Sequence, residues 1–206
     1  MEKYLQQEKS DCLKVVLFGP ESTGKSSLAK ELADHYNTLY VDEFARNYLQ
    51  EKWDKYQLAC ELKDIIPIAK GQMKNENIIA KKTTKILFCD TDLLTTATYS
   101  KLYFNGYCDP DLQESAIKNH YDLYLLMDID IPWVKDDLRD KPNDRKVFFN
   151  SFKNSLDLNK KKYSVISGNF QKRKEMAIGL INNLLCLLYT SPSPRDISGS
   201  RMPSSA

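Results

Sequence analysis

The distribution of apolar and polar positions along the chain predicts alternating strands and helices. Five short runs rich in aliphatic, β-branched and aromatic residues lie at 14–18, 38–41, 85–89, 123–127 and 163–166. Several of these runs are almost continuously apolar, as strands covered on both faces are. Helical periodicity separates them, and this alternation is typical of a parallel sheet with crossover helices. We therefore predict an α/β three-layer fold around a central five-stranded parallel sheet.

The second crossover helix has a recognisable start. We expect it to begin near Ile65 with Asp64 as its N-cap, because a short polar side chain there can accept a hydrogen bond from a free amide of the first turn. Pro67 then falls in the first turn, where a missing N–H is tolerated.

Composition narrows the classes of partner. The 206 residues include 30 Lys and Arg against 28 Asp and Glu, a formal charge of +2, so no overall cationic field favours nucleic acid or an anionic membrane. The most apolar stretch, 178–189, is shorter than the roughly 20 residues that span a bilayer. The five cysteines form no CxxC pair and the opening residues lack a signal sequence, so we expect a cytoplasmic protein. The oligomeric state stays open.

The end of the chain differs in character from the rest. Residues 190–206 contain six Ser, three Pro and one Gly among 17 residues and show no apolar periodicity. Such a composition cannot bury enough surface to offset chain entropy. We predict that 189–206 is a disordered tail of non-native origin, with a phosphorylatable Ser-Pro tail as the alternative.

A phosphate-binding loop directly follows the first predicted strand. Residues 19–26 read GPESTGKS, the GxxxxGKS pattern, between an apolar strand and a helical segment. Glycines let the loop curl so that successive amides and the helix dipole face a phosphate chain. Lys25 can then reach the β- and γ-phosphates. The expected ATP-binding residues are Gly19, Glu21, Ser22, Thr23, Gly24, Lys25, Ser26 and Ser27.

An acidic residue at the end of the third predicted strand completes this site. The apolar residues 86–89 lead into Asp90, the arrangement in which a carboxylate holds Mg²⁺ beside the phosphate loop. Ser26 and Asp90 are therefore the expected Mg²⁺ residues. Asp92 either lines the same cleft as a substrate contact or caps the helix that begins near Leu93.

The second predicted strand ends in acidic residues that point to a substrate side. Ligands of open α/β sheets bind outside the carboxyl ends of the strands, which places Asp42 and Glu43 at the cleft. A carboxylate there can bind ribose hydroxyls or accept the proton of an attacking hydroxyl. Arg46, one turn later, can neutralise substrate or pair with an acid. The alternative for Asp42 and Glu43 is ordinary capping of the next helix.

A charged segment at 136–145 is expected to form a helical or loop lid. Arg139 and Arg145 on this segment would spread positive charge over a transferring phosphoryl group. A solvated loop is the alternative interpretation of such a charge run. Just before it, Trp133 could stack on a flat base or be a buried aromatic residue.

Taken together, the segments GPESTGKSSLAKELA, VDEFAR, ILFCDTDLLTT, YDLYLLMDIDIPWVKDDLRDKPNDR and VISGNFQKR resemble the ribosylnicotinamide kinase domain of the NadR-type family. The resemblance runs from about Leu13 to Leu185. It implies a nucleoside-kinase-like P-loop fold that uses ATP and Mg²⁺. By resemblance, Lys25 and Ser26 serve phosphate and Mg²⁺, Asp90 is the acidic strand end, Asp42 is the substrate-side carboxylate, and Arg139 and Arg145 belong to the lid.

The resemblance implies transfer of a phosphoryl group from ATP to the 5′-hydroxyl of nicotinamide riboside, an alcohol acceptor, to give nicotinamide mononucleotide. The chain has no HxGH-like motif and thus resembles the kinase part alone. We divide it into an N-terminal extension at 1–12, a P-loop kinase domain at 13–188 and the tail. The alternatives are a kinase for another nucleoside or a nucleoside monophosphate, and a nucleotide-binding switch without an acceptor.

Overall fold

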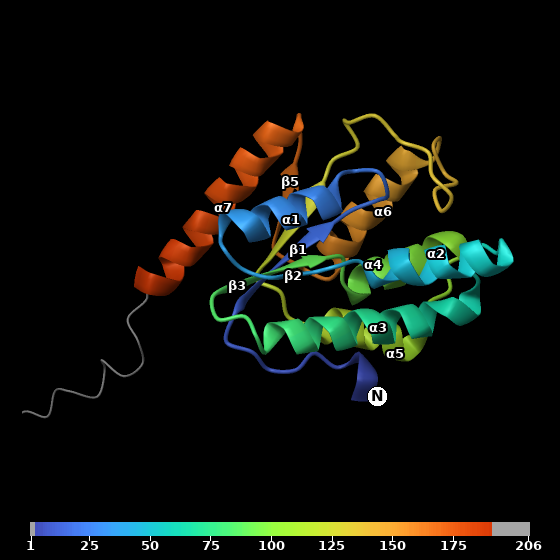
Figure 1. Ribbon diagram of the computed structural model, residues 1–206, viewed down its shortest axis with the longest axis horizontal. Helices are drawn as coiled ribbons and strands as arrows, with labels where there is room; N and C mark the ends of the chain where they lie inside the picture. The colour runs from blue at the N-terminus through green and yellow to red at the C-terminus, as the bar shows by residue number, and fades with distance from the viewer. Residues whose placement is uncertain (1–2, 191–206) are drawn as a thin grey trace, which may run out of the picture.

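A computed structural model describes residues 3–190 and contains the predicted parallel sheet (Figure 1). Its five strands are β1 (Leu13–Phe18), β2 (Tyr40–Val41), β3 (Ile86–Asp90), β4 (Leu123–Met127) and β5 (Tyr163–Ile166). They are ordered β2-β3-β1-β4-β5, and all pairs are parallel. β1 is therefore hydrogen-bonded on both sides, and the predicted sheet is confirmed. The predicted tail lies outside the described residues except for 189 and 190, which end the last helix.

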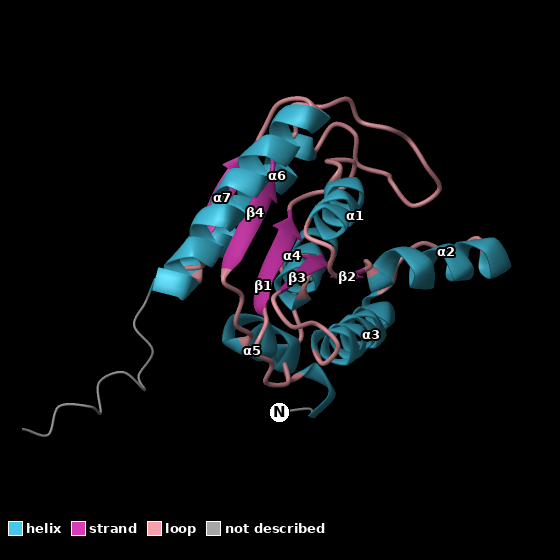
Figure 2. Cartoon of the chain, turned by 60° about the vertical axis from the view of Figure 1, so that its left-hand side comes forward, coloured by secondary structure: helices cyan, strands magenta, loops and turns pink. Residues whose placement is uncertain are grey.

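Seven α-helices and one short 3-10 helix surround the sheet in the described part of the chain (Figure 2). The bounds are η1 (Lys3–Leu5), α1 (Lys25–His35), α2 (Phe44–Tyr56), α3 (Leu62–Ala80), α4 (Leu93–Tyr103), α5 (Pro110–Lys118), α6 (Arg145–Leu158) and α7 (Phe170–Thr190). Side chains alternate between the two faces of a strand. In β1, Val15 and Leu17 pack with α1 and α7, whereas Val16 and Phe18 pack with α3, α4 and α6. The result is three layers with one core on each side of the sheet.

The start of α3 differs from its prediction. The helix begins at Leu62, and Glu61 is the N-cap in place of Asp64. Glu61 and Asp64 form a capping box, in which the Asp64 carboxylate accepts a hydrogen bond of 2.8 Å from the Glu61 amide. The Glu61 side chain in turn accepts from the Asp64 amide, so the two acids cap the helix about one turn earlier than expected. Pro67 consequently lies inside the helix.

The N-terminal residues are part of the packed structure. Leu5 is fully buried in the core below α3. The Gln7 amide donates to the Glu76 carboxylate at 2.8 Å, and Glu76 also pairs with Lys14 of β1 at 2.9 Å. This buried ion pair is completed by the Tyr121 hydroxyl at 2.7 Å.

Within residues 3–190, no helix is long and apolar enough to cross a membrane.

The beginning of α2 is fixed against α3 by a close contact. A Cβ at Gly71 would lie 2.2 Å from a ring atom of Phe44, so only glycine fits there. The Phe44 amide donates to the Gln72 side chain at 2.8 Å. None of the residues of α2 is buried. The helix stands at the edge of the molecule (Figure 2), and beyond its first turn Lys52 ties it to α3 through ion pairs with Glu61 at 2.7 Å and Asp64 at 2.5 Å.

Candidate functional site

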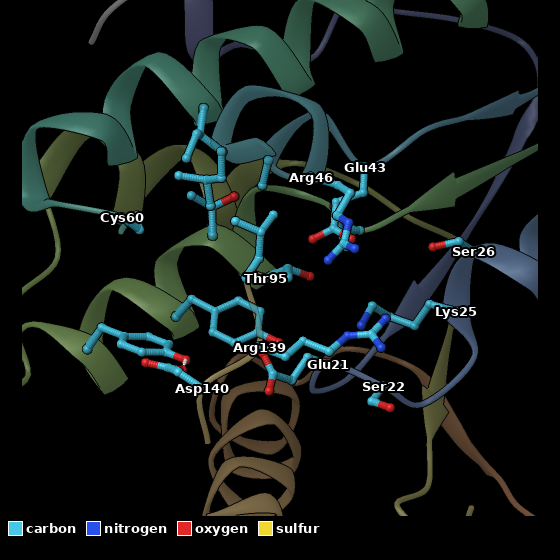
Figure 3. A pocket seen from close by; sticks show the side chains of 18 of the residues that line it. Glu21, Ser22, Lys25, Ser26, Glu43, Arg46, Cys60, Thr95, Arg139 and Asp140 are labelled. Atoms are coloured by element: carbon cyan, nitrogen blue, oxygen red, sulfur yellow. Dashed lines mark hydrogen bonds between the residues drawn. The ribbon is translucent and has the colours of Figure 1, made fainter. Parts of the chain in front are cut away.

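A cavity of about 560 Å³ lies at the carboxyl ends of the central strands (Figure 3). One end is formed by residues 21–27, the loop that follows β1 and the start of α1. The other walls come from α2, α3, α4 and the long loop between β4 and α6. The sequence-predicted residues that line it are Glu21, Ser22, Thr23, Gly24, Lys25, Ser26, Ser27, Glu43, Arg46 and Arg139.

The loop after β1 adopts a conformation that depends on its glycines. Gly19 has a φ of 132° and Gly24 has a φ of 80°, values that side chains disfavour. A Cβ at Gly19 would also approach the Met127 carbonyl oxygen to 3.1 Å. α1 begins immediately afterwards at Lys25, so its free amides and positive dipole face the cavity. Lys25 is nearly buried, and its ammonium donates to the Pro20 carbonyl at 2.8 Å.

The sheet register brings Asp90 next to this loop. Asp90 pairs with Leu17, two residues before Gly19, and is 1% exposed. Burial raises the pKa of Asp90 to about 7, and the charge of Glu43 adds to this effect, while Lys25 and a hydrogen bond from Ser26 oppose it. One Asp90 oxygen, Oδ1, is buried without a hydrogen-bond partner. A hydroxyl and an unsatisfied carboxylate oxygen are suitable ligands for Mg²⁺.

The two acidic residues after β2 occupy different environments. Asp42 is exposed, accepts a hydrogen bond from Tyr40 and is not one of the residues that line the cavity. Glu43 lines the cavity and is the N-cap residue of α2, but its side chain makes no capping hydrogen bond. Of these two acids, Glu43 is the one that lines the cavity, and Figure 3 shows its side chain beside Arg46.

Asp92 serves a structural purpose. It is fully buried, and its carboxylate accepts hydrogen bonds from the Thr95 amide at 2.9 Å and from the Tyr124 hydroxyl at 2.8 Å. It is the N-cap of α4 and does not line the cavity. Of the two interpretations of Asp92, the geometry favours capping over contact with substrate.

The loop from 128 to 144 joins β4 to α6 and passes over the cavity. Arg139 lines the cavity, and Figure 3 shows its side chain directed toward Lys25. Arg145 instead donates to the carbonyls of Ile131 at 2.8 Å and Ser22 at 3.4 Å and is absent from the cavity lining. Trp133 also lies outside the lining, where its indole donates to Glu21 at 3.1 Å. Arg145 and Trp133 therefore contact residues of the phosphate loop, Ser22 and Glu21, and do not themselves line this cavity.

Sequence reasoning missed much of the wall opposite the phosphate loop. Its members are mostly apolar or aromatic and come from α2, α3, α4 and the segments beside them. They include Leu49, Trp53, Cys60, Ile65, Ile68, Thr95, Thr96, Tyr99, Tyr103 and Phe104. Such residues have the composition of ordinary core positions, so the pattern alone does not distinguish them. Burial raises the pKa of the Cys60 thiol to about 11.

A further arginine holds the phosphate loop from behind. Arg173 of α7 is 2% exposed and donates to the Thr23 carbonyl at 2.7 Å and to the Gly168 carbonyl at 2.7 Å. It also pairs with Asp130. The loop is thus braced by the turn after β5.

A phosphate loop that leaves the central strand, with its acidic partner on the adjacent strand, defines the P-loop class of α/β proteins. The chain belongs to the AAA domain family, whose model matches residues 14–173. It is 33% identical over 147 residues to the trifunctional NAD biosynthesis/regulator protein NadR of Escherichia coli K12, covering 70% of this chain and 36% of that protein. The NadR of Salmonella typhimurium LT2 is 34% identical over 138 residues, covering 66% and 33%. The chain therefore spans about a third of these curated relatives, and its resemblance to NadR-type proteins is confirmed.

Solved structures agree on the fold. A NadR protein in complex with NR superposes with a TM-score of 0.68 at 20% identity, covering 84% of this chain and 51% of that one. NadR in complex with NAD and AMP-PNP gives 0.65 at 19% identity, covering 94% and 52%. A deoxyadenosine kinase from M. mycoides gives 0.62 at 16% identity, covering 83% and 100%. The predicted P-loop kinase fold is confirmed.

Proposed function

We propose that this chain is an ATP-dependent kinase that phosphorylates the 5′-hydroxyl of nicotinamide riboside to give nicotinamide mononucleotide. One observation carries the proposal: the phosphate loop and an apolar, aromatic wall line the same cavity of about 560 Å³. That volume suits a small-molecule ligand with a few well-placed polar contacts. The relatives support the choice of acceptor, because NadR is named for NAD biosynthesis and one NadR structure holds NR.

In the proposed reaction, the acceptor oxygen bonds to the γ-phosphorus while the bond to the bridging oxygen breaks and ADP leaves. Phosphoryl transfer requires mainly positioning and charge stabilisation from a protein. The amides of residues 21–26 and the Lys25 ammonium would hold the phosphates. Arg139 would stabilise charge on the transferring group from the lid side.

Ser26 and Asp90 are the residues that would hold Mg²⁺. The unpartnered Asp90 oxygen and the adjacent Ser26 hydroxyl fit this role. In the described range 3–190, no group of three or more His, Cys, Asp or Glu residues could hold a metal. This agrees with an ion bound by one carboxylate together with substrate phosphates and water. Bound Mg²⁺ supplies charge that neutralises the phosphate oxygens.

Glu43 is the residue that we assign to accept the proton of the attacking hydroxyl. It lines the cavity, and its charge influences both Asp90 and Arg46, so it lies between the phosphate side and the acceptor side. Asp42 is the alternative, since its charge also reaches Asp90 although it faces solvent. The acceptor proton would pass to whichever carboxylate is closer, and the position of Glu43 favours it.

The cavity wall opposite the phosphate loop, formed by residues of α2, α3 and α4, is named the acceptor wall. Its charge distribution favours a nucleoside over a nucleoside monophosphate as acceptor. Among the described residues of α2, α3 and α4 that line the cavity, Arg46 is the single cation. Its guanidinium already pairs with Asp136 at 2.7 Å. A monophosphate acceptor would need cations available for its phosphate, so a nucleoside monophosphate kinase is the weaker candidate.

The proposal is tested by coupled measurement of ADP release with Mg-ATP and the full chain. Nicotinamide riboside, the common nucleosides and their monophosphates would be compared as acceptors. We expect the highest kcat/KM with nicotinamide riboside. Higher turnover with another nucleoside would replace the acceptor but keep the kinase. Nucleotide binding without any acceptor-dependent turnover would contradict the kinase and support the nucleotide-switch alternative.

We also propose that the protein acts in the cytoplasm on small molecules, without a nucleic-acid partner. The formal charge of +2 and the lack of a CxxC pattern in the sequence support this setting. A polyanion competition experiment would test it, because heparin at low salt should leave turnover unchanged.

A further inference from the structure

The carboxylate of Asp136 contacts two arginines from different parts of the cavity. Arg46 of α2 donates to Asp136 Oδ2 at 2.7 Å, and Arg139 Nε approaches the same oxygen at 3.1 Å. Arg46 and Arg139 both line the cavity, whereas Asp136 does not. The three side chains are 40%, 26% and 23% exposed for Arg46, Arg139 and Asp136, so the cluster lies at the cavity mouth.

The local backbone also fixes the direction of Arg139. The Leu138 amide donates to Asp136 Oδ1 at 3.0 Å, which closes a tight turn before Arg139. The Arg139 guanidinium donates through Nη1 to the Val134 carbonyl at 2.8 Å. A guanidinium has five N–H donors, so others remain for a ligand. Figure 3 shows this side chain extending toward Lys25, and the charges of both Arg139 and Lys25 act on Glu21.

The rest of the loop is attached to both sides of the cavity. On the phosphate side, the Val134 amide donates to the Ser22 hydroxyl at 2.8 Å. On the acceptor side, the Tyr103 hydroxyl donates to Asp140 at 2.7 Å. The contacts of Asp136 are of another kind, because its single negative charge pairs both with Arg139 of the lid and with Arg46 of α2.

Resting on the proposed function, we propose that Asp136 is a positioning residue that holds Arg139 over the phosphate loop and docks the lid on α2. Asp136 touches no reacting atom; it acts through Arg139. Partly exposed ion pairs are weak, which suits a contact that must open for substrate to enter. A small displacement of a guanidinium that stabilises a transition state costs rate more than binding.

The first experiment compares Asp136→Asn with Asp144→Asn. The amide introduced by Asp136→Asn keeps an acceptor oxygen for the turn and removes the charge. Asp144 lies on the same loop, and its side chain makes no capping hydrogen bond. We expect Asp136→Asn to lower kcat by roughly 10- to 100-fold while the KM for ATP changes by less than about 3-fold. Asp144→Asn should leave both unchanged. A wild-type kcat in Asp136→Asn overturns the proposal.

A double-mutant cycle with Arg139→Gln tests whether Asp136 acts through Arg139. If it does, Asp136→Asn should lower kcat by less than about 2-fold in the Arg139→Gln background. Independent, multiplicative losses overturn the proposal. Hydrogen–deuterium exchange is a second readout that needs no turnover: amides 134–140 should exchange faster in Asp136→Asn than in Asp144→Asn. If the wild type turns over no acceptor, the proposed function fails. The exchange measurement still tests Asp136 in that case: equal exchange of amides 134–140 in Asp136→Asn and Asp144→Asn would overturn its role.

Discussion

The Ser26 hydroxyl, in the first turn of α1, is hydrogen-bonded to the Asp90 carboxylate at the end of β3. β1 and β3 are neighbouring strands, and the pairing of Leu17 with Asp90 brings Asp90 to the end of β1, where the phosphate loop that leads to Ser26 begins. Because Asp90 is 1% exposed, its negative charge has little access to water. The site therefore places Asp90, whose ionisation is disfavoured by burial, beside the loop at 19–26, whose amides favour anions such as phosphates.

The first prediction concerns pH and stability without nucleotide or Mg²⁺. The pKa of Asp90 rises from 3.8 to about 7 in the folded protein, so the folded state binds more protons than the unfolded state between these values. The free energy of unfolding should then fall as the pH rises through this range. Asp90→Asn cannot ionise and should unfold at a higher temperature than wild type at pH 8, but not near pH 4. Equal midpoints at pH 8 would contradict the shift.

The second prediction tests whether activity depends on Lys25 itself and not on lysines of α1 in general. Lys25→Ala should lower kcat by at least about 100-fold, as loss of a donor to developing charge typically does. Lys30→Ala changes an exposed lysine on the same helix and should retain wild-type kcat. ADP release measures both, and circular dichroism confirms folding, since Lys25 is nearly buried. Comparable activity of Lys25→Ala and Lys30→Ala would rule out the assigned role.

The third prediction distinguishes the two acids after β2. Glu43→Gln should lower kcat by roughly 100-fold or more, in the range for loss of a general base. Asp42→Asn should have a much smaller effect, because Asp42 faces solvent. The affinity for ATP, measured by calorimetry, should stay within about 3-fold in both variants. A larger kcat loss in Asp42→Asn would return the role of proton acceptor to Asp42.

The fourth prediction compares the two tryptophans. Trp53 lines the acceptor wall, whereas Trp133 lies outside it and donates to Glu21. Trp53→Ala should raise the acceptor KM by about 10-fold or more with little change in the KM for ATP. Trp133→Ala should leave the acceptor KM unchanged and lower kcat through the lid. The reverse pattern would mean that Trp133 stacks on the acceptor base.

The sheet and the phosphate site could be predicted because their signals are local. The ranges 123–127 and 163–166 match β4 and β5. β4 is fully buried, and a buried parallel strand is a continuous apolar run, whereas β5 at the sheet edge is recognised from its β-branched and aromatic residues. The loop at 19–26 carries its own motif. Once the order of strands is known, Asp90 follows, because parallel strands end at the same edge of the sheet.

The acceptor wall could not be predicted because it depends on where helices begin and how they lie. Whether Asp42 or Glu43 reaches the cavity depends on α2 starting at Phe44, a boundary set by the contact of Phe44 with Gly71. Arg145 is the first residue of α6, and its guanidinium donates to the Ile131 and Ser22 carbonyls instead of lining the cavity. Such facts are tertiary, and no spacing in the sequence encodes them.

The attachment of α2 has a consequence for divergence within the family. Because no residue of α2 is buried, substitutions along it, apart from Phe44 at Gly71 and Lys52 at Asp64, should cost little folding stability. The same helix supplies Leu49 and Trp53 to the acceptor wall. Natural variation can therefore change the preferred acceptor by altering α2, while the strands and the phosphate loop are retained. Preference for one nucleoside over another should accordingly evolve faster in this fold than the ability to use a nucleoside triphosphate.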